Sequence, residues 1–316
     1  MNNEQGEPLV PVGIGNGPAQ QRFIQRHQGY VVEVPKLIAL CNKVFKRNLA
    51  PPDESEYRAL FDANLPDEDP AVVAWEDRVT GGNLIFNLGL MACDDFNAIS
   101  FLTGNGAGFS AFIILRSMYE RLVTAMYIAK KPSEARTFAE SSPIYKLNFL
   151  GRLRELIPEV KARYDDAFMD QVRQDAAAAK AKRKRSICSK CGQPITNDAW
   201  TRVSLDVMAR EVHSDLKKLY APIYIEGTYQ AHANSMGMER RLEQTENGYR
   251  YKSDIEAEAE ATMAVYFAHR LMLHFIDMQN EHFKLNLDDE IRERLEAYKA
   301  IWHPTQSEAD DEPSTS

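Results

Sequence analysis

The stretch FSAFIILRSMYERLVTAMYIA, from Phe109 to Ala129, decides the fold. Apolar side chains stand on nearly every face of the helix that it predicts, which is typical of a helix buried in a bundle. Arg116, Glu120 and Arg121 lie near its middle. Because each such charge costs roughly 2.5–3.5 kcal/mol at the centre of a bilayer, the stretch is predicted to be a core helix and not a membrane span.

Helical periodicity continues on both sides of this stretch. Apolar residues from Val34 onward follow helical spacing, with Pro35 expected in a first turn. TGNGAG, from Thr103 to Gly108, is expected to be a tight turn between helices, because glycine relieves backbone strain. Further helical patterns cover residues 83–102, 134–141, 143–157, 159–182, 214–234, 253–282 and 288–302. The predicted fold class is therefore all-α, a multi-helix bundle.

Two segments depart from the helical pattern. Asn247-Gly248, between polar and aromatic residues, predicts a minor β-hairpin with a type I′ turn. SICSKCGQPITND, residues 186–198, predicts a small C-x-x-C insertion. The domains expected are a flexible arm at 1–30, a helical bundle at 31–302 with the insertion at 183–199, and a disordered acidic tail at 303–316.

Composition limits the classes of partner. The chain has 316 residues and a formal charge of −8, so broad binding to nucleic acid is unfavourable, although a local basic groove is compatible with that charge. The N-terminus has neither the positive region nor the apolar region of a secretory signal. Cys41 and Cys93 stand singly in apolar helical patterns and are expected to be buried thiols. These features predict a cytoplasmic protein without a membrane span.

Cys188 and Cys191 form the most recognisable short motif, CSKCG. C-x-x-C followed by glycine is the turn of a zinc knuckle, in which both thiolates point at one ion. A structural zinc site needs four ligands, and the sequence has no second C-x-x-C. His213, or a second pair of thiolates from a dimer, could complete it. Otherwise the motif is a degenerate knuckle that holds no metal.

The central helix carries the first candidate site for a ligand. Helical spacing puts Arg116, Glu120 and Tyr127 on one face. Because the other faces are apolar, Arg116 and Glu120 are expected to be a partly buried pair. One interpretation is a structural ion pair between helices. The other is a polar pocket in which Arg116 binds an anion and Glu120 orients it or transfers protons.

A second polar stripe lies in LYAPIYIEGTYQAHANS. Tyr224, Thr228, His232 and Ser235 fall within about 80° of one another on a helix with a 3.6-residue period. His232 is either a hydrogen-bonded core residue or a general base. We expect this stripe to face Arg116 and form a polar seam, since polar groups on apolar helices need partners.

R-S-M-Y-E on a hydrophobic helix, a Trp200-led segment with V-M-A-R-E, and a Tyr-rich helix ending in His resemble an uncharacterised family of helical bacterial proteins, catalogued as domains of unknown function. The resemblance covers about residues 83–282. It implies that Arg116, Glu120, Tyr224 and His232 stand at recurrent polar positions. Thr228 replaces a frequent Ser, and the C-x-x-C insertion is peculiar to this branch. The resemblance implies a fold and a bacterial source but no reaction.

Two functions remain open. The first is a non-catalytic module that binds a protein partner, a second copy of the chain or a small anion through the Arg/Glu/His seam. The alternative is a nuclease-like or phosphoryl-transfer enzyme of a toxin or phage-defence system, with Arg116, Glu120 and His232 as catalytic candidates. Helical ribonucleases of the HEPN type use R-x(4–6)-H on one helix. Here Arg22 and His27 have that spacing but fall in the expected arm, and Arg270 and His274 are one residue too close.

Overall fold

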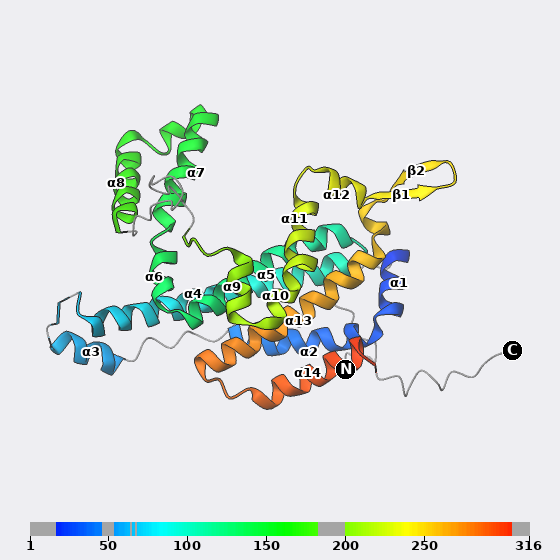
Figure 1. The fold of residues 1–316 in the computed structure, drawn as a ribbon, viewed down its shortest axis with the longest axis horizontal. Coiled ribbons are helices and arrows are strands. Elements are labelled where there is room, and N and C mark those ends of the chain that lie inside the picture. The colour runs from blue at the N-terminus through cyan, green and yellow to red at the C-terminus, as the bar shows by residue number, and fades with distance from the viewer. Residues whose placement is uncertain (1–16, 46–53, 64, 67, 183–199, 305–316) are drawn as a thin grey trace. The chain divides into compact units, whose positions relative to one another are not determined.

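The computed structural model describes residues 17–45, 54–63, 65–66, 68–182 and 200–304. Within these residues the chain is all-α apart from one two-stranded antiparallel hairpin (Figure 1). The fold class predicted from the sequence is therefore confirmed. The chain divides into two compact units, residues 1–50, 85–127 and 205–316 in the first and residues 51–84 and 128–204 in the second.

The first unit holds most of the helices and the hairpin (Figure 1). Its elements, two of which continue into the second unit, are α1 (Pro18–Arg26), α2 (Gln28–Phe45), α4 (Pro70–Gly104), α5 (Gly108–Lys130), α9 (Leu205–Val212), α10 (Ser214–Leu219), the π-helix η2 (Tyr220–Ile225), α11 (Glu226–Ala231), α12 (Ser235–Glu239), β1 (Leu242–Thr245), β2 (Gly248–Tyr251), the 3₁₀ turn η3 (Asp254–Glu256), α13 (Glu258–Phe283) and α14 (Asp288–Trp302).

The second unit is a smaller helical group. It holds the start of α4, the end of α5 and the elements α3 (Glu54–Asp62), α6 (Ser133–Ala139), α7 (Ser142–Leu156), the 3₁₀ turn η1 (Pro158–Ala162) and α8 (Asp166–Lys182). Ile144 and Leu150 of α7 pack against apolar residues of α8. Arg136 of α6 pairs with Asp77 of α4 at 3.1 Å.

The core of the first unit is built on α5 and α13, which contribute many of its fully buried side chains. Phe112, Leu115 and Leu122 of α5 are completely or almost completely buried, as the prediction of a core helix requires. The N-terminus of α5 approaches α13 closely, because a Cβ at Gly108 would lie 2.3 Å from the carbonyl oxygen of Ala257. The turn before it contains Gly106 at φ +81°, so the glycine-rich segment is a tight turn, as expected.

Two predicted boundaries and one predicted turn type were wrong. Residues 18–26 form α1 instead of part of a flexible arm, and Phe23 and Tyr30 are buried. α2 begins at Gln28, so Pro35 lies inside the helix and not in its first turn. The hairpin pairs Thr245 with Gly248, which leaves Glu246 and Asn247 as its turn. Neither has a positive φ, so the turn is not type I′.

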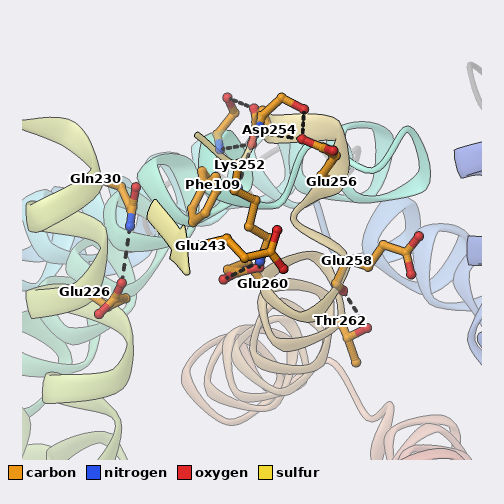
Figure 2. A network of polar contacts seen from close by, with 12 residues as sticks. Phe109, Glu226, Gln230, Glu243, Lys252, Asp254, Glu256, Glu258, Glu260 and Thr262 are labelled. Carbon is orange, nitrogen blue, oxygen red and sulfur yellow. Dashed lines mark hydrogen bonds and ion pairs between the residues drawn. The ribbon is translucent and has the colours of Figure 1, made fainter. Parts of the chain in front are cut away.

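The base of the hairpin is fixed to the rest of the first unit (Figure 2). Lys252 donates to Glu260 of α13 at 2.9 Å, and its ammonium lies 5.6 Å from the centre of the Phe109 ring. Asp254 caps α5 by accepting from the backbone N–H of Phe109 at 2.8 Å. Tyr249 and Tyr251 of β2 remain exposed. The hairpin is therefore a projecting ribbon on an ordered base.

The predictions for the C-x-x-C motif and the acidic tail concern residues outside the described part of the chain. The prediction that the chain has no membrane span is not tested. Cys188, Cys191 and residues 305–316 are outside the described residues. Among the described helices, α4 is long and apolar enough to cross a membrane by length and composition, with 39% of its most apolar window buried. That finding alone does not assign α4 to a membrane, because core helices share these properties.

Candidate functional site

Arg116 and Tyr224 are the two predicted seam residues that do meet. The guanidinium of Arg116 lies 4.7 Å from the centre of the Tyr224 ring and donates to its hydroxyl at 3.3 Å. Tyr224 stacks in turn on Tyr220, with ring centres 5.3 Å apart. Gly227 of α11 makes this approach feasible, since a Cβ there would lie 2.6 Å from that of Arg116. The contact is a cation–π interaction that joins α5 to η2.

Glu120 and His232 do not take their predicted places. Glu120 is exposed on α5, and no ion pair joins it to Arg116 among the described residues. His232 is the C-cap of α11, with extended backbone and an exposed side chain. The expectation of a partly buried Arg116–Glu120 pair was therefore wrong.

Tyr127 and Thr228 are used structurally. Tyr127 is 1% exposed in the core. The Thr228 hydroxyl donates to the backbone carbonyl of Tyr224 at 2.6 Å, within its own helical segment. A hydroxyl bonded to the preceding turn of its own helix adds little to a seam facing another helix.

A groove on the first unit brings together more ionisable side chains than the predicted seam. Its volume is about 580 Å³, within the range of small-molecule sites. It lies among α5, α10, α13 and α14. Its lining residues are Met126, His213, Asp215, Arg270, Leu273, His274, Asp277, Met278, Glu281, Leu295, Tyr298, Lys299 and His303.

His213 and His274 face each other in this groove, with ring centres 5.2 Å apart. His213 caps α10, because its Nδ1 accepts from the backbone N–H of Asp215 at 3.2 Å. An accepting Nδ1 leaves the proton of the neutral ring on Nε2, so His213 offers the groove an N–H donor. Burial, and then the nearby His213 and Arg270, lower the pKa of His274 to about 4. His274 is therefore a neutral imidazole at neutral pH.

Arg270 is held by a carboxylate in the same groove. Its Nη2 donates to Asp215 at 2.7 Å, and both side chains are about 30% exposed. Burial opposes ionisation of Asp215, but hydrogen bonds and charge from Lys218 and Arg270 lower its pKa overall. Asp215 thus holds His213 by its backbone and Arg270 by its side chain, and so places an imidazole beside a guanidinium.

Asp277 and Glu281 form the acidic end of the groove. They lie one helical turn apart on α13, and neither has an ion-pair partner among the described residues. Burial, and then the charges of Glu281 and Asp288, raise the pKa of Asp277. The negative charge at this end is therefore not neutralised within the described chain.

Arg22 and His27, the pair whose spacing matches that of helical ribonucleases, do not form an open site. Arg22 pairs with Glu258 at 2.5 Å, and the Nε2 of His27 lies 3.0 Å from the Thr262 hydroxyl. His27 is 7% exposed, and the cavity that it shares with Arg22 has a volume of only about 10 Å³. This cavity can hold about one water and no nucleotide.

The described residues do not form a metal site. In the described residues no three His, Cys, Asp or Glu side chains are placed to hold an ion together. Cys41 and Cys93, which are described, are both free thiols. Any zinc bound by Cys188 and Cys191 concerns the segment outside the described residues.

The comparisons with known proteins identify a family but no reaction or ligand. The model of a family of unknown function (DUF5677) matches residues 83–249, more than half of the chain. This match covers the α10 wall of the groove and ends before α13 and α14. No curated protein and no solved structure matches the chain. The resemblance to a family of unknown function, inferred from the R-S-M-Y-E helix, is thereby confirmed.

Proposed function

The chain belongs to the DUF5677 family of unknown function, and we propose that it is a helical binding module whose ligand occupies the groove among α5, α10, α13 and α14. One observation carries this proposal. His274 is partly buried and lines a groove of about 580 Å³, and its ring forms no hydrogen bond with the described residues. Its free ring nitrogens can therefore form hydrogen bonds with a ligand in the groove.

The composition of the groove supports binding. Leu273, Met278 and Leu295 supply apolar surface, and His213 and Tyr298 supply polar groups around it. A mostly apolar hollow with a few convergent polar groups is the usual form of a small-molecule site. The groove therefore replaces the seam of Arg116, Glu120 and His232 as the candidate site.

A fragment screen by ligand-observed NMR tests the proposal. The library should contain cations, anions and neutral compounds, and each hit should be retested against His274→Trp, whose larger ring fills the groove. His232→Trp is the matched control, because His232 is exposed at the end of α11. Hits that bind wild type and His232→Trp but lose binding to His274→Trp support the groove. If every hit binds His274→Trp as well as wild type, the groove is not the ligand site.

The enzyme alternative draws on the same residues. Two imidazoles with ring centres 5.2 Å apart stand beside Arg270, an arrangement that could handle a phosphodiester. Two features favour binding over this reaction. Asp215 neutralises Arg270, and an imidazole with a pKa near 4 is a weak base at neutral pH. Cleavage of single-stranded RNA by the purified protein, abolished in both His274→Ala and Arg270→Ala, would reverse this preference.

A further inference from the structure

We infer that the ligand of this groove is an organic cation, a protonated amine attached to an apolar body. The inference deepens the proposed function and depends on the groove being the binding site. Four properties of the groove carry it: its unpaired carboxylates, its paired cations, the neutral ring of His274, and an apolar part of the lining that includes the ring of Tyr298.

The unpaired carboxylates are Asp277 and Glu281. They stand at positions i and i+4 of α13, and Asp288 adds a third negative charge close to Asp277. Like charges at this spacing on a helix repel each other. A cation bound between them would remove that repulsion. An anionic ligand would increase it.

The positive side chains of the groove are already engaged. Arg270 is paired with Asp215 at 2.7 Å. Lys299 is paired with Glu296 at 2.7 Å, in a part of α14 where both side chains are more than 60% exposed. Against these two cations stand three lining carboxylates, Asp215, Asp277 and Glu281, so the charge balance of the groove is negative.

His274 adds no positive charge to this balance. His274 is neutral at neutral pH, because its pKa is lowered to about 4. The Nδ1 of His213 accepts the backbone N–H of Asp215, so this nitrogen is already engaged. His303 lies at the edge, with its Nε2 3.5 Å from the Tyr266 hydroxyl. The neutral ring of His274 has one nitrogen that can accept a hydrogen bond from an ammonium group.

Part of the groove lining is apolar. Tyr298 is 7% exposed, and its ring lines the groove. Its electron-rich ring is also a surface on which cations bind. Met126, Met278 and Leu295 continue this part of the lining. An alkyl or aryl chain would pack there while its ammonium reaches the carboxylates.

Three six-carbon probes separate charge from shape: hexylammonium, hexan-1-ol and hexanoate. Binding is followed by the ¹³C-methyl signals of the methionines, because Met126 and Met278 line the groove. A charge-assisted hydrogen bond should make hexylammonium bind about tenfold more tightly than hexan-1-ol, and hexanoate should bind most weakly. The Asp277→Asn/Glu281→Gln variant should abolish the preference. Glu239→Gln/Glu246→Gln changes the charge equally, at exposed sites of the same unit that do not line the groove, and should retain the preference.

Each result decides the proposal. If hexan-1-ol or hexanoate moves the Met126 and Met278 signals at concentrations equal to or lower than hexylammonium, the groove is a ligand site but not for cations. The same conclusion follows if the fragment screen gives groove ligands of which none is a cation. If no probe and no fragment moves these signals, both the cation proposal and the proposed function are wrong.

Discussion

The stability of the first unit should fall steeply in mild acid because two of its histidines are buried in the neutral form. Burial, and then Arg294, lower the pKa of His269 to about 4, and burial, followed by His213 and Arg270, lowers that of His274 to the same value. The ordinary pKa of both is 6.5. The unfolded chain therefore binds protons below pH 6.5 that the folded chain does not accept until about pH 4. Stability is thus fully present above this window and is lost as the pH falls through it.

The magnitude follows from the size of the shift. Each group removes roughly 1.4 kcal/mol per pH unit within the window, so each should cost about 2 kcal/mol between pH 7 and pH 5. His274→Gln removes one of the two groups, and its ring has no hydrogen bond with the described residues to lose. Hydrogen exchange of the α13 amides reports on this unit alone, which matters because the chain has two units.

The expected result is a difference between variant and wild type that changes by about 2 kcal/mol in favour of His274→Gln between pH 7 and pH 5. His232→Gln, at an exposed position, should follow wild type at both values. If wild type and His274→Gln lose stability in parallel, then His274 is not buried as a neutral ring, and the description of the groove is wrong.

Three further predictions concern other parts of the chain. Arg294 and Glu33 form a buried pair at 2.6 Å between α14 and α2, so Arg294→Met should destabilise by about 3–5 kcal/mol in chemical denaturation, and adding Glu33→Leu should recover part of the loss. A loss of unfolding free energy below about 0.5 kcal/mol would show that the pair is exposed to solvent. Gly227→Ala should cost about 1–3 kcal/mol by overpacking against Arg116, whereas Gly151→Ala, with open space around it, should be neutral or slightly stabilising; equal effects would contradict the close approach. If Cys188 and Cys191 bind zinc, the purified protein should contain it by elemental analysis and Cys188→Ser should not, and absence of zinc under reducing conditions would leave a degenerate knuckle.

The sequence determined the helices well where periodicity and breakers agree. α14 begins at Asp288 and ends at Trp302, as predicted, because three acidic residues precede a regular apolar stripe. The helix predicted to begin at residue 253 starts later, because Ser253 and Glu256 form a capping box on a 3₁₀ turn and α13 starts at Glu258. Gly81 and Gly82 do not interrupt α4, since tertiary packing overrides a weak propensity.

The predicted seam failed at Pro222. Proline has no backbone N–H to donate to the preceding turn, and the chain accommodates it with the π-helix η2 at Tyr220–Ile225. A stripe calculated with a constant period of 3.6 residues is not valid beyond such a segment. α11 then ends at Ala231, so His232 leaves the helix on which its partners stand.

The groove could have been located on α13, where the signal is periodic. Arg270, His274, Asp277 and Glu281 are spaced i, i+4, i+7 and i+11, and this polar stripe crosses an otherwise apolar helix. The same reasoning that selected Arg116 and Glu120 applies to it more strongly, because four polar residues on one face need more partners than two. What the periodicity of a single helix cannot provide is the opposite wall. His213 and Tyr298 come from α10 and α14, more than 50 residues before and more than 10 residues after the stripe. A polar stripe therefore predicts that a site exists, whereas its ligand depends on residues that only the tertiary fold brings together.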